Sequence, residues 1–202
     1  MILSNRAIHK ALDQGSLVID PEPIPRRPDI SREPCPYQTS AVDLRLSDEI
    51  VHFRSGKSAA PFIIDLSIRK FTQLPQDTFI TKRLVGSDVY EIKPREFLLA
   101  QTLERVALPL KKGRACLAAR VEGRSSYARS GLSVHFTAPT IHAGFDGKIT
   151  LELMNHGEYS IMLRPGMFIC QLIVEQVFGY PFENVSQFQN QSNPTGPRQP
   201  DR

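Results

Sequence analysis

The sequence predicts a single domain with an all-β core and a short N-terminal helix, on three observations. Twelve Gly and 16 Pro divide the chain into many short apolar runs, which is typical of strands joined by turns. Among these runs, residues 148–154 alternate apolar and polar side chains as a half-buried strand does. The length of 202 residues, with 41% hydrophobic and 23% charged residues, suits one globular domain with a sizeable core.

Two segments precede the predicted strands. Residues 4–14 are expected to form a helix, because Ser4 is a suitable N-cap, Ile8 and Leu12 lie on one helical face, and Gly15 suits the position after the helix end. Residues 21–36 contain six prolines, which exclude regular helix and disfavour a central strand. We therefore expect an extended arm on the surface or around a neighbouring subunit.

The apolar runs that follow predict a barrel or jelly-roll-like core. In chain order, the expected strands are Val42–Leu46, Phe62–Leu66, Thr78–Thr81, Val89–Ile92, Phe97–Leu103, Ala115–Val121, Ser133–Thr137, Lys148–Met154, Tyr159–Leu163 and Phe168–Val177. The single domain is expected to span residues 1–182. Residues 183–202 are rich in Gln, Asn, Ser and Pro and lack apolar periodicity, so they predict a flexible tail or a lid that orders over a ligand.

Composition excludes several classes of protein. Three widely separated cysteines without a C-x-x-C spacing indicate reduced thiols and no disulfide framework. The N-terminus lacks the apolar region of a signal peptide, and no run approaches the length of a membrane span, so we expect a cytoplasmic protein with no membrane partner. A net charge of +4 from scattered Lys and Arg disfavours nucleic acid and is compatible with a small polyanionic ligand.

The densest group of reactive side chains lies directly after a predicted strand, in the stretch GRSSYARSGL at residues 123–132. It contains two guanidinium groups, from Arg124 and Arg129, and the adjacent hydroxyls of Ser125 and Ser126. Flanking glycines let the backbone approach a ligand closely. These features suit binding of a phosphate chain, although a solvated polar turn between strands explains the same composition equally well.

The predicted strand at residues 148–155 places Thr150 and Glu152 on the face opposite its apolar residues. A glutamate on the polar face of a strand is usually solvated, so Glu152 becomes a candidate catalytic residue only if the phosphate-type stretch packs nearby. The intervening loop, residues 137–147, can present backbone groups to the edge of a base. Within that loop, His142 is either a ligand contact or a histidine satisfied within the core.

A zinc deaminase is the main alternative that the motifs raise. His156-Gly157-Glu158 matches the first half of its signature, but the required P-C-x-x-C is missing and only Cys170 follows, so we expect no zinc. Phosphate-binding Walker loops, dinucleotide fingerprints and nucleophile elbows are absent from the sequence as well.

Taken in order and spacing, these residues resemble the dCTP deaminase family of the dUTPase-like superfamily. The resemblance rests on the stretch at 123–132, the loop at 137–147, the strand ending in Leu151-Glu152, and RPGMFICQLI at 164–173. It extends outward to residues 17–21, 42–46, 64–66 and 99–109, and only the proline arm lacks a counterpart. The resemblance implies a β-clip type of distorted barrel that works as a homotrimer with active sites between subunits.

The resemblance also assigns roles. Glu152 corresponds to the glutamate that takes a proton from water and delivers it to the pyrimidine. Ser125 and Arg129 position the water and the reacting ring, and Ala138 offers a backbone carbonyl. The nucleotide is expected to contact Arg124, Ser125, Ser126, Thr137, His142, Thr150 and Gln191, with Mg²⁺ bridging substrate phosphate oxygens and no metal held by the protein itself.

Three departures from the family pattern bear on specificity. His142 stands where many members have an aspartate that is implicated in diphosphate hydrolysis, which disfavours a dUTPase-type activity. Pro139-Thr140 replaces the His-Arg pair of bacterial monofunctional enzymes, and Gln187 replaces a phosphate-binding lysine in the tail. Deamination of dCTP to dUTP is the leading hypothesis, with a dUMP-forming enzyme or dUTP diphosphatase and a non-catalytic nucleotide-binding homologue as alternatives.

Overall fold

The computed structural model describes residues 1–29, 34–54, 63–67, 70–113, 115–184 and 186–197. Its N-terminal helix, α1 (Asn5–Asp13), begins after Ser4, whose Oγ accepts a hydrogen bond from the Ala7 amide at 3.3 Å. The chain leaves the helix through Gly15, which has a φ of +63°. Ile8 is fully buried, so the predicted apolar face of α1 does pack against the domain.

The larger of the two main sheets has the strand order β4-β3-β6-β10-β8, with β1 also paired to β6. Its long central strands are antiparallel and place Glu152 opposite Leu99. The strand bounds are β1 (Val18–Asp20), β3 (Glu49–Phe53), β4 (Phe79–Arg83), β6 (Phe97–Ala107), β8 (Leu132–Ser133) and β10 (Asp146–Asn155).

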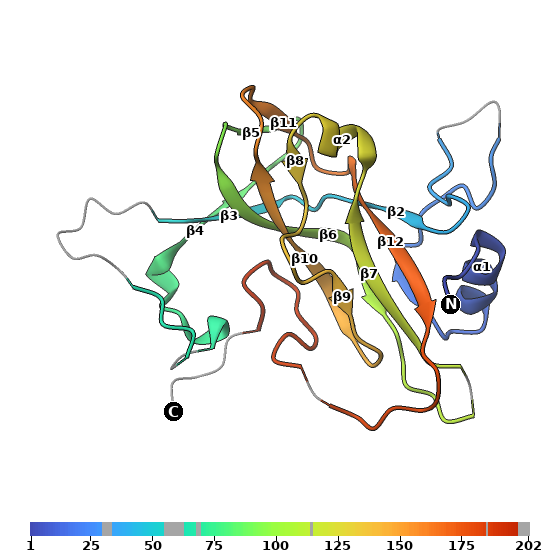
Figure 1. Cartoon of the computed structure of the whole chain (residues 1–202). Coiled ribbons are helices and arrows are strands. Elements are labelled where there is room, and N and C mark those ends of the chain that lie inside the picture. Colours follow the sequence, from blue (N-terminus) through green and yellow to red (C-terminus); the bar gives the residue numbers. More distant parts are fainter. Residues whose placement is uncertain (30–33, 55–62, 68–69, 114, 185, 198–202) are drawn as a thin grey trace.

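The second main sheet has the order β2-β12-β7-β9, and β5 pairs with β11 as a separate two-stranded sheet. Figure 1 shows β7 and β12 running side by side, with β6 and β10 crossing near them. The strand bounds are β2 (Val42–Arg45), β5 (Tyr90–Ile92), β7 (Leu117–Gly123), β9 (Thr140–Ile141), β11 (Ile161–Leu163) and β12 (Phe168–Gln176). The short helices are α2 (Ser125–Arg129), η1 (Phe71–Gln73) and η2 (Gln76–Thr78).

The main core is formed by inward-facing apolar side chains from both sheets, including Leu44, Leu151 and Leu172, none of which retains solvent exposure. Burying each such side chain contributes about 1.5–3 kcal/mol, so these strands supply much of the driving force for folding. A smaller apolar cluster, with Val51, Leu74, Phe79 and Leu99, lies apart from it. Since β10 alternates between buried and half-buried residues, Glu152 is kept outside the main core.

Two strand predictions were wrong. Phe62 lies outside the described residues, and 63–66 form no strand; Ile63 and Leu66 are 81% and 72% exposed. Of the expected strand at residues 133–137, only Ser133 is paired, as the last residue of β8. Local composition favoured strands here, but among the described residues no strand pairs with 63–66 or with 134–137.

The remaining expected strands are present with shifted ends, whereas β1, β3, β9 and α2 had not been predicted. Both β1 and β9 contain only two or three residues, and they exist because distant residues pair with them, Val18 with Ala107 and Ile141 with Ala119. Such short strands have no local signature of their own.

Candidate active site

The phosphate-type stretch forms a tight turn into α2. Gly123 ends β7, Arg124 caps α2, and Ser125, Ser126 and Arg129 expose their side chains. Gly131 follows with a φ of +92°, and a Cβ there would lie 2.5 Å from the Gly157 amide nitrogen. This close approach requires glycine and fixes α2 against the turn after β10.

Arg124 is the best anchored side chain of this group. Its Nη1 donates to Asp43 Oδ2 at 2.9 Å, and its guanidinium carbon lies 5.7 Å from the Tyr127 ring centroid and 5.8 Å from that of Phe168. The Arg124 side chain is 29% exposed and that of Asp43 only 3%. One guanidinium nitrogen therefore binds the Asp43 carboxylate, while part of the Arg124 side chain stays accessible to solvent.

Glu152 lies on the half-buried face of β10. Its Oε2 accepts a hydrogen bond from the Phe136 amide at 3.2 Å. The Phe136 ring is 48% exposed and makes edge contacts with Phe97 and His156. Thr137 and Ala138 follow Phe136 directly and are both exposed, so the loop that holds the carboxylate also presents main-chain groups beside it.

Three more of the predicted nucleotide-binding residues are Thr150 on β10, Gln191 in the C-terminal tail and His142 in the loop before β10. The hydroxyl of Thr150 donates to the Pro194 carbonyl at 3.3 Å. Gln191 is 7% exposed, and its Nε2 donates to the Lys148 carbonyl at 2.6 Å. His142 is exposed. The C-terminal tail therefore packs on β10, so that Thr150 of β10 bonds to the tail and Gln191 of the tail bonds to β10.

The structure brings the predicted residues together in two groups. Arg124, Ser125, Ser126 and Arg129 lie on α2 or at its start, and Glu152 lies with the 136–138 loop. Across the described ranges, no hydrogen bond or ion pair joins a side chain of the first group to Glu152. The segments that carry the two groups are connected through the backbone: Ser133 of β8 pairs with Met154 of β10, and the His156 amide donates to the Gly131 carbonyl.

The sequence had not singled out Asp43, Gln171 or Phe136. Gln171 Nε2 donates to Asp43 Oδ1 at 2.8 Å, so both side chains help to hold Arg124. One signal was available for Asp43, because an aspartate between Val42 and Leu44 interrupts an apolar strand and requires a buried partner. The Phe136 amide gave no such signal, since main-chain contacts do not depend on residue type.

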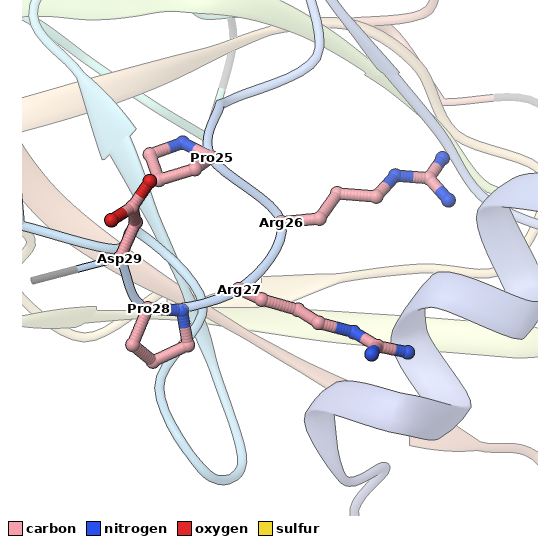
Figure 2. A pocket seen from close by; sticks show the side chains of 5 residues that line it. All are labelled: Pro25, Arg26, Arg27, Pro28 and Asp29. Atoms are coloured by element: carbon pink, nitrogen blue, oxygen red, sulfur yellow. The ribbon is translucent and has the colours of Figure 1, made fainter. Parts of the chain in front are cut away.

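Figure 2 shows a concave surface on the proline arm that is separate from both groups. Pro25, Arg26, Arg27, Pro28 and Asp29 line it, and the two arginine side chains extend toward α1. Arg26 forms ion pairs with Asp13 at 2.7 Å and with Glu22, which lowers the pKa of the Glu22 carboxyl. The first part of the predicted arm is therefore attached to α1 of its own chain.

Within the described ranges, no three His, Cys, Asp or Glu side chains cluster in a way that could hold a metal ion. His156 instead lies 3.2 Å from the Ser133 hydroxyl. No helix in the part of the chain that is described is long and apolar enough to cross a membrane.

The architecture is a mostly β fold of two main sheets that share one apolar core, with short helices outside them. Residues 2–177 match the family described as dCTP deaminase-like, and this protein belongs to that family. Its fold is similar to that of the 2′-deoxycytidine 5′-triphosphate deaminase from Agrobacterium tumefaciens, with a TM-score of 0.58 and 18% identity. That match covers 86% of this chain and 47% of the Agrobacterium chain.

Curated relatives extend the similarity over nearly the whole chain. A Dictyoglomus thermophilum protein named "dCTP deaminase, dUMP-forming" is 36% identical over 203 residues, covering 98% of this chain and 94% of the relative. A protein of the same name from Methanosphaera stadtmanae is 39% identical over 175 residues, covering 86% and 78%. A "dCTP deaminase" from Haloarcula marismortui is 37% identical over 199 residues, covering 96% and 92%.

Proposed function

We propose that this protein deaminates dCTP, with Glu152 as general base and then general acid. The observation that carries the proposal is the setting of Glu152 in a chain of the dCTP deaminase-like family: its carboxylate is accessible and receives the Phe136 amide beside an exposed loop. A carboxylate held by one main-chain donor keeps free lone pairs with which to accept a proton from water.

The proposed reaction uses one water and one carboxyl group. Glu152 removes a proton from the water as its oxygen bonds to C4 of cytosine, and the protonated carboxyl then delivers that proton to N3. The restored carboxylate then takes the remaining proton of the C4 hydroxyl and passes it to the C4 amino group. The C–N bond breaks, ammonia leaves, and the C4 carbonyl of uracil forms. Ser125 and Arg129 are proposed to position the water and the ring, and the Ala138 carbonyl to accept from the amino group.

The exposed polar groups near α2 are proposed to bind the phosphates. Arg124, Ser125 and Ser126 supply guanidinium and hydroxyl donors for a triphosphate, and Mg²⁺ bound to the substrate would offset part of the triphosphate charge. Thr137, His142, Thr150 and Gln191 are proposed to contact the nucleotide once the tail rearranges. The three cysteines are unpaired, which supports action in a reducing compartment such as the cytoplasm.

A homotrimer is proposed to complete the site. Within the described part of one chain, no hydrogen bond or ion pair joins a side chain of the α2 group to Glu152, which supports sites formed where one subunit's α2 meets another subunit's Glu152. Mixing Arg129→Ala and Glu152→Gln subunits tests this arrangement, since about a quarter of randomly formed interfaces would be intact. Recovered ammonia release supports shared sites, whereas two inactive variants that stay inactive together place the whole site in one chain.

The first experiment is incubation of the purified protein with dCTP and Mg²⁺, with and without a zinc-selective chelator, while ammonia and nucleotides are measured. Ammonia release that the chelator leaves unchanged is the expected result. Loss of activity on chelation would contradict the metal-free chemistry. Binding of dCTP without any ammonia would instead make this protein a non-catalytic nucleotide-binding homologue.

A dUMP-forming enzyme is the second candidate, favoured by the names of the Dictyoglomus and Methanosphaera relatives. It would release diphosphate as well as ammonia. The exposed imidazole of His142 argues against it, because a neutral imidazole or imidazolium lacks the carboxylate charge expected to assist an attacking water there. The same incubation decides between the two products, dUTP alone or dUMP with diphosphate.

A further inference from the structure

Asp43 is a buried carboxylate at the junction of three strands. It is 2% exposed and lies on β2, where it pairs directly with Gln171 of β12, and β12 in turn pairs with the end of β7 that leads into Arg124. Its Oδ1 accepts from Gln171 Nε2 at 2.8 Å, and its Oδ2 accepts from Arg124 Nη1 at 2.9 Å and Gln38 Nε2 at 3.2 Å. A carboxylate this buried is costly unless it is paired, so its partners are held firmly.

Arg124 is fixed by these contacts on more than one side. The carboxylate holds one nitrogen, and the rings of Tyr127 and Phe168 both lie within 6 Å of its guanidinium carbon, at distances suited to cation–π attraction. A free arginine loses several rotatable bonds of freedom when it binds a phosphate. An arginine already held in place loses less on binding.

We propose that Asp43 is the positioning residue of the phosphate-binding group, acting through Arg124; the inference rests on the proposed function. Asp43 has two opposing effects on phosphate binding. It positions the Arg124 guanidinium, which favours binding, and its negative charge offsets the positive charge that attracts a phosphate, which weakens binding. Arg124 is partly exposed, and water and salt there screen the charge effect. The geometry of the charge-assisted hydrogen bond is not screened in this way, so positioning dominates and removing the Asp43 charge weakens triphosphate binding.

The test is calorimetric binding of dCTP, dCDP and dCMP, each with Mg²⁺, to the full-length wild type and to Asp43→Asn. We expect the Kd for dCTP to rise about tenfold and the Kd for dCMP less than about twofold, because the phosphate chain bears the loss. Gln171→Met is a milder variant that removes one donor and keeps the ion pair. It should raise the Kd for dCTP about threefold, and it covers the case in which Asp43→Asn does not fold.

Glu104→Gln is the matched control. Glu104 is another fully buried carboxylate, and it receives Arg45 Nε at 2.7 Å instead of a residue of the phosphate-binding group. This variant should lower thermal stability as Asp43→Asn does, but leave the three nucleotide affinities within about twofold of wild type. A merely structural role for Asp43 would give both variants the same binding profile.

A second control measures whether Asp43 acts through Arg124. In an Arg124→Gln background, Asp43→Asn should add no further rise in the Kd for dCTP, since the residue that it positions is gone. An equal further rise, an unchanged or tighter dCTP affinity in Asp43→Asn alone, or equal losses for dCTP and dCMP would each overturn the proposal. Wild type that binds dCTP but releases no ammonia refutes the proposed function alone, and wild type that binds none of the nucleotides refutes both.

Discussion

Arg124 and Glu152 are both charged side chains that the sequence assigned to one site, yet their surroundings differ. Arg124 is held by a buried carboxylate and two aromatic rings, whereas Glu152 receives one main-chain amide and has no ion-pair partner among the described residues. The comparison teaches that the charged group proposed to hold phosphate is joined to the core. The group proposed to exchange a proton keeps free lone pairs.

The third strand carboxylate of interest, Glu104, sharpens this difference. It has no exposure, and it accepts hydrogen bonds from the Arg45 amide at 2.9 Å and Arg45 Nε at 2.7 Å. Like Asp43, Glu104 directs both of its carboxylate oxygens to hydrogen-bond donors of the protein. Of these three, Glu152 alone is half-buried, which agrees with its proposed role in catalysis.

The largest expected effect comes from Glu152→Gln, which keeps the shape of the side chain and removes its basicity. We expect ammonia release from dCTP to fall by about 10²–10⁴-fold, because that is the usual contribution of a positioned general base. The Kd for dCTP should change by less than about threefold, and the unfolding free energy by less than about 0.5 kcal/mol. Substantial residual turnover would remove Glu152 from the mechanism.

Arg124→Ala, unlike Glu152→Gln, should lower both the stability of the protein and its affinity for dCTP. Removing the guanidinium leaves Asp43 buried without its cation, so we expect a loss of about 2 kcal/mol in the free energy of unfolding, measured with urea. The Kd for dCTP should also rise by about tenfold or more. If the free energy of unfolding is unchanged while dCTP binding is lost, the ion pair between Arg124 and Asp43 does not stabilise the fold. The difference drawn between Arg124 and Glu152 would then be wrong.

Gly147→Ala tests the contact between the C-terminal tail and β10, the strand that also carries Glu152. A Cβ at this position would lie 3.0 Å from both N and O of Gln191, so the tail should be displaced from β10 at a cost of about 1 kcal/mol. Faster proteolytic release of the C-terminal residues, followed by mass spectrometry, is the expected readout. Gly86→Ala is the matched control, since its φ is +61° and nothing lies within 4 Å of an added Cβ.

The smallest effect concerns Cys170, which is buried near Asp43. Burial raises the pKa of its thiol, with the Asp43 and Glu104 carboxylates adding to the shift, so the reactive thiolate is scarce at neutral pH. Iodoacetamide should modify half-buried Cys35 sooner than Cys170 in the folded protein. Asp43→Asn should accelerate Cys170 modification a few-fold by loosening its surroundings, and an unchanged rate would show that the network does not depend on the charge of Asp43.

Much of the fold and part of the site follow from local pattern. The alternation at residues 148–154 placed Glu152 on the face opposite Leu151, and the structure confirms this. Ser4 and Gly15 correctly marked the ends of α1. These predictions succeed because the period of a strand and the cap of a helix depend on neighbours within a few residues.

Other features depended on the tertiary structure. The residues at 63–66 have strand character but form no strand, while β9 is only two residues long and exists because Ala119 pairs with Ile141. The sequence determined which side chains alternate, which residues end the helix and which family the motifs resemble. Only the tertiary structure decided that Arg124 meets Asp43, 81 positions away, and that the Phe136 amide meets Glu152. Such partners are chosen by the packing of distant strands and by main-chain groups, which every residue type carries alike.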